Sequence, residues 1–167
     1  DEIDAAQIVA TGAWTRPIAA LALGLLGDRF GISRMALFCF VLLIISHSLF
    51  AFTGAELGTL SMILLNTLVT GIAIFGLRGL YFGLLEEGQI PLTVTGTAVG
   101  LVSVIGYTPD VYIAAIAGYL IDQSPGLAGF QHLFMLLLAF SIVGAIAAIV
   151  FERQAHAASV TGGVNSP

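Results

Sequence analysis

Five apolar stretches of membrane-crossing length dominate this sequence. Short polar connections separate them, and they cover residues 8–26, 35–52, 57–85, 90–121 and 130–151. A stretch of about 18 or more apolar residues can cross the ~30 Å hydrocarbon layer of a bilayer as a helix. We therefore expect an all-α fold, a polytopic membrane helix bundle with five transmembrane helices.

Composition supports the membrane class and excludes nucleic acid as a partner. Hydrophobic residues make up 58% of the chain and charged residues 9%, whereas a soluble domain is about one quarter charged. The sequence has no lysine, and its arginines are too scattered to form a basic patch for nucleic acid. No cluster of histidine, cysteine and acidic residues has metal-ligand spacing, so we expect neither a metal nor a cofactor.

The arginines outside the apolar stretches predict the orientation of the chain. Arg29 and Arg34 lie in the first connection, and Arg153 follows the fifth stretch. Because four crossings separate these places, all three arginines fall on one side of the membrane, and basic residues mark the cytoplasmic side. We therefore expect a cytoplasmic C-terminus, with residues 154–167 forming a disordered tail.

A compact glycine-rich motif joins the first two stretches. It reads Gly-x-x-Gly-Asp-Arg-x-Gly with a basic residue beyond it, and its residues are Gly24, Gly27, Asp28, Arg29, Gly31 and Arg34. The motif resembles the cytoplasmic signature loop of the major facilitator superfamily of transporters. This resemblance implies that Asp28 and Arg29 latch neighbouring helices in one access state, whereas the residues alone also fit a solvated helix end. Ile32 and Ser33 depart from the family pattern, which commonly has basic residues there.

The resemblance extends over most of the chain. Five spans with the signature loop after the first are similar to helices eight to twelve of a twelve-helix transporter of this superfamily. We therefore expect a fragment in which residues 1–153 form most of the C-terminal six-helix half, with the N-terminal half as a missing partner. Residues 86–91, 96–100, 106–110 and 118–122 also resemble bacterial members grouped with nitrate/nitrite or organic-anion carriers, which implies a bacterial inner membrane.

Three charged residues, Arg16, Arg78 and Asp110, lie inside the apolar stretches. Each costs at least ~2.5 kcal/mol at the centre of a bilayer helix, so such residues usually face a bundle interior or a water-filled cavity. Two positive charges against one negative charge favour binding of an anionic solute. Two alternatives stay open: Arg16 and Asp110 neutralise each other as a packing ion pair, or Arg78 extends its side chain toward the cytoplasmic surface.

Two tyrosines lie near these charges. Tyr107 is one helical turn from Asp110, and Tyr81 shares a helix face with Arg78. A phenol can donate a hydrogen bond to a solute oxygen, so both tyrosines are candidate solute-binding residues. Ordinary hydrogen bonds between helices are the alternative.

Proline stands beside two of the charges, in the pairs Arg16-Pro17 and Pro109-Asp110. A proline inside a helix removes a backbone hydrogen bond and bends the helix. Interrupted helices beside charges are common at transporter binding sites. We expect Pro17 and Pro109 to be hinges for alternating access, with a simple tolerated kink as the alternative.

The remaining patterns predict packing rather than binding. Small residues such as Gly96 and Gly100 recur along one face of the fourth stretch, which would let a neighbouring helix approach closely. The second and fifth stretches carry no charge and are expected to be lipid-facing supports. Glu86 and Glu87 are expected to be a solvated turn.

These patterns together predict a secondary active transporter that moves a small, anionic solute across the lipid bilayer by alternating access, with proton coupling through Asp110 left open. We expect no enzyme, because the sequence has no nucleophile motif, metal motif or paired intramembrane aspartates. The alternative is a five-span structural or channel subunit of a membrane complex, in which the arginines are assembly contacts.

Overall fold

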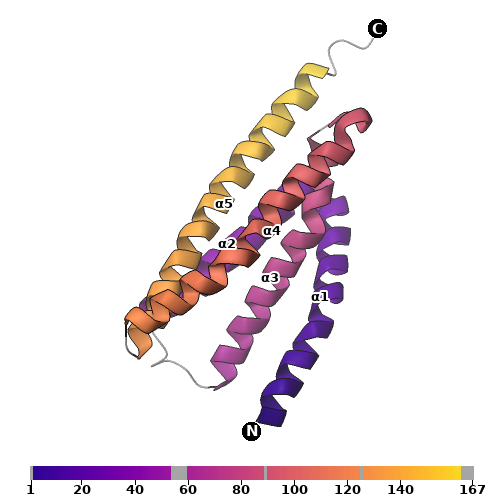
Figure 1. The fold of residues 1–167 in the computed structure, drawn as a ribbon. Helices are drawn as coiled ribbons and strands as arrows, with labels where there is room; N and C mark the ends of the chain where they lie inside the picture. The colour runs from indigo at the N-terminus through magenta and orange to yellow at the C-terminus, as the bar shows by residue number, and fades with distance from the viewer. Residues whose placement is uncertain (1, 54–59, 89, 125, 163–167) are drawn as a thin grey trace.

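The computed structural model describes the backbone of residues 2–53, 60–88, 90–124 and 126–162, and the side chains within 16–53, 61–88, 90–91, 93–124 and 126–157. The described residues form five α-helices and no strand (Figure 1), which confirms the all-α class. The helices are α1 (Glu2–Phe30), α2 (Ile32–Thr53), α3 (Leu60–Glu87), α4 (Leu92–Gln123) and α5 (Leu127–Gly162).

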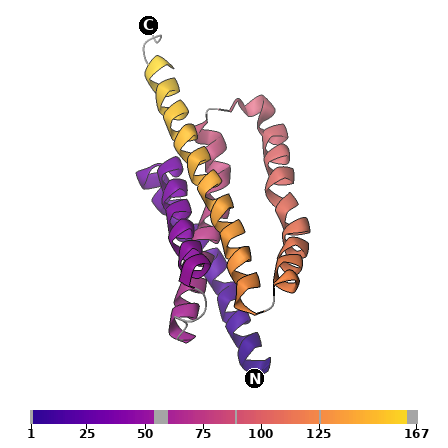
Figure 2. The same cartoon turned by 90° about the vertical axis from the view of Figure 1, so that its left-hand side faces the viewer.

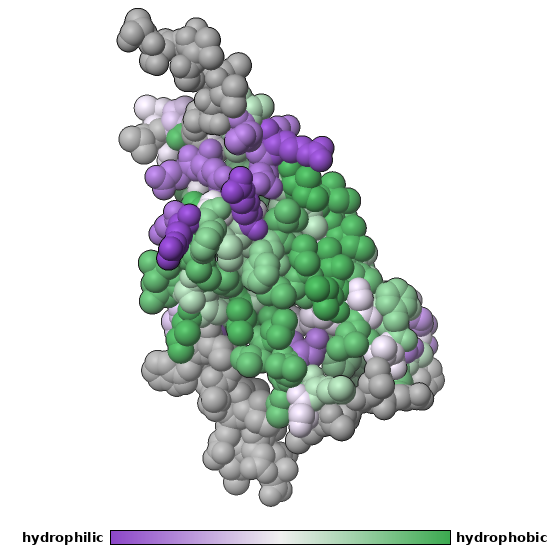
Figure 3. Space-filling view, turned by 180° about the vertical axis from the view of Figure 1, so that it is seen from behind, coloured by the Kyte–Doolittle hydropathy of each residue, from purple (hydrophilic) through white to green (hydrophobic). Residues whose placement is uncertain are grey.

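Four of the helices carry membrane-length apolar segments within the described residues. These segments are Ile32–Thr53, Ser61–Glu87, Thr93–Gln123 and Leu127–Ala157. Residues 8–15 of the first predicted span lie outside the part of the chain whose side chains are described. Figure 3 shows apolar side chains across the middle of one face, with hydrophilic side chains gathered at the end where α5 finishes.

The first connection differs from the sequence prediction. Instead of a loop over residues 27–34, α1 continues to Phe30, α2 begins at Ile32, and Gly31 alone separates the two helices. Gly31 has φ of +99°, a backbone conformation that a side chain disfavours. Its N–H donates to the Gly27 carbonyl at 2.8 Å, so the turn also completes the hydrogen bonding at the end of α1.

The C-terminal helix is longer than the apolar stretch that predicted it. α5 continues to Gly162, which extends the helix into the segment that we expected to be disordered from residue 154. Residues 163–167 lie outside the described part of the chain.

The helices alternate in direction along the chain (Figures 1 and 2). α2 packs most extensively on α5 and also contacts α1 and α3, while α1 packs along α3. Buried side chains where α1, α2 and α3 meet form the core: Leu23, Ala36, Cys39, Leu43, Ala73 and Leu80. The second stretch therefore contributes one side to the core, while side chains such as Phe38 and Ile45 stay exposed, and its lipid-facing role stays a prediction.

α4 stands to one side of the other helices (Figure 2). It contacts α5 and makes few contacts with α3, and none of the membrane-length segment Thr93–Gln123 is buried. A Cβ atom added at Gly96 or Gly100 would meet nothing within 4 Å. The small-residue face predicted to receive a helix therefore has none against it among the described residues.

The close approach that glycine permits occurs between α1 and α3 instead. A Cβ atom added at Gly79 would lie 2.8 Å from the Ala20 carbonyl oxygen and 3.2 Å from the Ala20 Cα atom. Because these atoms are backbone, they cannot move aside by a side-chain rotation. The α1–α3 contact therefore depends on the absence of a side chain at residue 79.

We expect Gly79→Ala to lower the stability of the protein by about 1–3 kcal/mol, the usual cost of overpacking. Gly71→Ala on the same helix is the matched control, because its added Cβ atom would come no closer than 4.0 Å to Phe75. Thermal unfolding of both variants in detergent measures the difference. An unchanged melting temperature for Gly79→Ala would show that α1 and α3 do not pack this closely.

Candidate functional site

The intramembrane charges on α3 and α4 meet directly. Arg78 Nη2 donates to Asp110 Oδ2 at 3.2 Å and to Oδ1 at 3.4 Å. The two side chains are 50% and 60% exposed in this chain. Since α3 and α4 contact each other little elsewhere, this ion pair is a principal link between them.

Tyr107 completes the surroundings of Arg78. The guanidinium carbon lies 5.7 Å from the centre of the Tyr107 ring, within the range of a cation–π interaction. Tyr107 and Asp110 are one turn apart on α4, so a single face of this helix provides both contacts. Tyr107 therefore contacts the Arg78 guanidinium group through its aromatic ring.

A cavity of about 360 Å³ lies beside the ion pair. α2, α3 and α4 line it with Phe40, Leu77, Arg78, Tyr81, Val102, Ser103, Gly106 and Tyr107. Its volume falls within the range of small-molecule sites. Three of the five predicted solute-binding residues, Arg78, Tyr81 and Tyr107, therefore line one cavity, and Asp110 contacts it through Arg78.

Tyr81, a residue of the cavity lining, carries an unusual polar atom in its hydroxyl group. It is buried and has no hydrogen-bond partner among the described residues. A buried polar group without a partner costs about 1–3 kcal/mol, so native structures rarely leave one unexplained. The site therefore holds a donor that the described residues leave unused.

Arg16 is not among the residues that line this cavity. Its guanidinium carbon lies 5.0 Å from the centre of the Phe75 ring on α3, one turn before Arg78. Asp110 pairs with Arg78, so the alternative in which Arg16 and Asp110 neutralise each other is not the arrangement observed. Asp110 is thus paired with an arginine, but the arginine is Arg78 and not Arg16.

Both predicted hinges lie within continuous helices. Pro17 is inside α1, and Pro109 is inside α4. Beside Pro109, the Thr108 hydroxyl donates to the Val104 carbonyl at 2.5 Å, whereas the carbonyl that loses its N–H donor to Pro109 is that of Ile105. The hinge role of the two prolines stays a prediction.

The predicted gating motif forms a helix junction. Gly24, Gly27, Asp28 and Arg29 belong to the last turns of α1, and Arg34 belongs to the first turn of α2. Gly27 is buried against α3, where an added Cβ atom would lie 2.5 Å from Leu80 Cδ2. Asp28 and Arg29 are exposed, and the Arg29 guanidinium lies over the ring of its neighbour Phe30. Their latch role stays a prediction.

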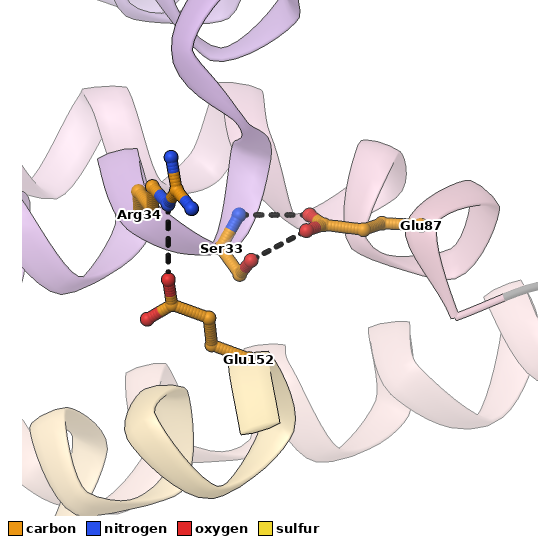
Figure 4. Close-up of polar contacts among 4 residues, drawn as sticks. All are labelled: Ser33, Arg34, Glu87 and Glu152. Carbon is orange, nitrogen blue, oxygen red and sulfur yellow. Dashed lines mark hydrogen bonds and ion pairs between the residues drawn. The ribbon is translucent and has the colours of Figure 1, made fainter. Parts of the chain in front are cut away.

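Polar contacts between helices at this end come from Ser33 and Arg34, in the first turn of α2 (Figure 4). Ser33 donates to Glu87 of α3 from its backbone N–H, at 2.8 Å, and from its hydroxyl, at 2.5 Å. Arg34 Nε donates to Glu152 of α5 at 3.1 Å. α2 is thus joined to both of its main neighbours at one membrane end.

The Ser33–Glu87 contact was missed from the sequence. The expectation that Glu87 belongs to a solvated turn is wrong, because its carboxylate accepts both Ser33 hydrogen bonds. The signal was available in part: the first N–H groups of a helix lack partners within the helix and favour a carboxylate. To predict Glu87 rather than Glu86 as the partner, one must know how α3 is rotated about its axis, and the sequence does not define this rotation.

A second polar group joins the helices deeper in the bundle. Ser46 Oγ donates to Asn66 Oδ1 at 2.8 Å and lies 2.5 Å from Thr70 Oγ1. The buried His47 Nδ1 lies 3.0 Å from Ser141 Oγ of α5. Successive residues of α2 therefore bind α3 and α5, which makes these polar groups structural contacts. No group of three metal-ligating side chains occurs among the described residues.

We expect Glu87→Ala to lower the stability of the protein by about 1–3 kcal/mol, since it removes a charged acceptor from two hydrogen bonds and leaves Ser33 unpaired. Glu86→Ala is the matched control, because it removes the same charge from an adjacent, exposed position. Thermal unfolding in detergent compares the two variants. Equal melting temperatures would show that the Ser33–Glu87 contact does not stabilise the helix ends.

Comparison with known proteins finds similarity to bacterial membrane proteins over about half of this chain. Inner membrane protein YihN of Escherichia coli (strain K12) is 31% identical over 88 residues, which cover 53% of this chain and 21% of that protein. Inner membrane protein YqcE of the same organism is 30% identical over 87 residues, 52% of this chain and 20% of that protein. No family model and no solved structure matches.

The aligned part spans about a fifth of the length of these two relatives. Their names place them in the inner membrane, and the four apolar helices of this chain are long enough to cross one. The two findings together support a multi-pass, membrane-integral protein.

Proposed function

We propose that this chain is part of a secondary active transporter that moves a small anionic solute by alternating access. Residues 1–153 would form most of the C-terminal half of a major facilitator superfamily fold, with the C-terminus on the cytoplasmic side. The observation that carries the proposal is the Arg78–Asp110 pair beside a cavity within membrane-length helices.

The exposure of this pair supports a binding surface rather than a packing contact. Both side chains are at least half exposed in this chain, yet charged groups that face hydrocarbon are costly. The unburied face of α4 must therefore meet either another part of the transporter or water. A central cavity between two helical halves would provide both.

Charge supports an anionic solute. Within the predicted apolar stretches Arg16 and Arg78 are balanced by Asp110 alone, so these stretches carry net positive charge. Positive charge in a low-dielectric cleft attracts and concentrates anions. Capture of the solute would then be electrostatic, and no reaction on the solute is needed.

The weak attachment of α4 supports movement. α4 contacts α5 and makes few contacts with α3, so rupture of one ion pair removes much of its link to α3. A solute that changes this ion pair would therefore change how firmly α4 is held. Such a coupling between binding and helix position is what alternating access requires.

The direct test is uptake of a panel of small anions by the complete protein in proteoliposomes, at two pH values. We expect Arg78→Ala to reduce uptake of the transported anion about tenfold or more, because one charged hydrogen-bonding group is worth about 1.5–3 kcal/mol. Arg153→Ala is the control, since it removes an arginine from the exposed end of α5.

Two results would contradict the proposal: no uptake of any anion by the folded protein, or uptake that survives Arg78→Ala unchanged. The comparison of two pH values decides whether protons accompany the solute. A transport rate that follows an imposed proton gradient in the wild type, but not in Asp110→Asn, would assign proton coupling to Asp110.

A further inference from the structure

The cavity beside Arg78 restricts the kind of anion that it can bind. Two of its polar residues, Arg78 and Tyr81, are one turn apart on the same face of α3. Both groups are donors, and the Tyr81 hydroxyl is buried without a partner among the described residues. A planar oxyanion with two oxygens could accept from both.

The ion pair between Asp110 and Arg78 has weak geometry. Its two contacts come from a single guanidinium nitrogen, at 3.2 and 3.4 Å, whereas charge-assisted hydrogen bonds are usually about 2.7–2.9 Å long. A guanidinium group has five N–H donors and binds a carboxylate best through two parallel hydrogen bonds. A solute carboxylate can therefore compete with Asp110 for Arg78 by offering better geometry.

The other walls of the cavity are largely apolar. Phe40, Leu77, Val102 and Gly106 carry no polar side-chain group, and Ser103 and Tyr107 are the further hydroxyl-bearing residues of the lining. Such walls stabilise an apolar body through its burial. A solute rich in hydroxyl groups would bury them without partners, which is strongly unfavourable. An inorganic anion such as nitrate would leave these walls without contact.

We propose that this cavity binds a small, apolar monocarboxylic acid, with its carboxylate between Arg78 and Tyr81, and that Asp110 is the internal counter-ion which the solute displaces. This inference rests on the proposed transport function and names its solute class. In the empty site Asp110 neutralises Arg78 and links α4 to α3. In the occupied site the solute neutralises Arg78, and the link to α4 is released.

Benzoate binding to the complete protein in detergent, measured by calorimetry, tests the solute class, with gluconate and nitrate as comparison anions. We expect benzoate to bind at least tenfold more tightly than either comparison anion. We expect Tyr81→Phe to weaken benzoate binding about tenfold, the loss of one hydrogen bond to a charged group. Tyr119→Phe, a tyrosine on α4 outside the cavity lining, is the control.

Asp110→Asn tests the displacement directly. Because the variant removes the competing carboxylate, we expect benzoate to bind at least threefold more tightly than to the wild type, while Arg78→Ala abolishes binding. A residue that only supports the fold would not tighten binding when replaced. Weaker or unchanged benzoate binding to folded Asp110→Asn would overturn the counter-ion role.

The outcomes separate this inference from the transport proposal. Arg78-dependent binding and uptake of gluconate or nitrate, without benzoate, would overturn the apolar monocarboxylate assignment and leave anion transport intact. The absence of Arg78-dependent uptake of benzoate would overturn the apolar monocarboxylate assignment, and its absence across the whole anion panel would contradict both proposals. If Asp110→Asn fails to fold, the selectivity of the wild type and the Tyr81→Phe comparison still decide the solute class.

Discussion

Placing polar groups inside a hydrocarbon layer is the constraint on which this structure depends. The helices satisfy their own backbone groups, so the side chains are what remain to be paired. Ser46 and His47 meet this need by hydrogen bonding across to α3 and α5. Arg78 and Asp110 pair in the same way but stay half exposed, which separates them from the structural contacts and makes them candidates for function.

α1 and α3 pack tightly against each other, whereas α4 packs loosely against its neighbours. α1 and α3 approach each other so closely that the Gly79 position has no room for a side chain against Ala20. The glycines of α4, including Gly96 and Gly100, have open space beside them. The first arrangement favours a rigid unit, and the second leaves a helix whose link to α3 depends largely on one ion pair. A fixed part and a movable part are what a rocking mechanism needs.

Apolar length was sufficient to predict the all-α class and the number and order of the helices. Contacts that depend on the rotation of each helix about its axis, or on the conformation of the connection at Gly31, were not predictable. Gly31 turns the chain with a positive φ, and Ser33, two residues later, binds Glu87. Likewise, three intramembrane charges were recognised, but which arginine pairs with Asp110 depends on how α3 and α4 face each other, a feature that periodicity alone does not define.

The central claim is that the face bearing Arg78 and Asp110 borders water inside the membrane. Reaction of Ser103→Cys with a membrane-impermeant thiol reagent in intact vesicles tests it, in a Cys39→Ala background that removes the buried native thiol. The account predicts rapid labelling at residue 103, which lines the cavity, and none for Val143→Cys on the apolar surface of α5. An unreactive Ser103→Cys in the folded protein would contradict it.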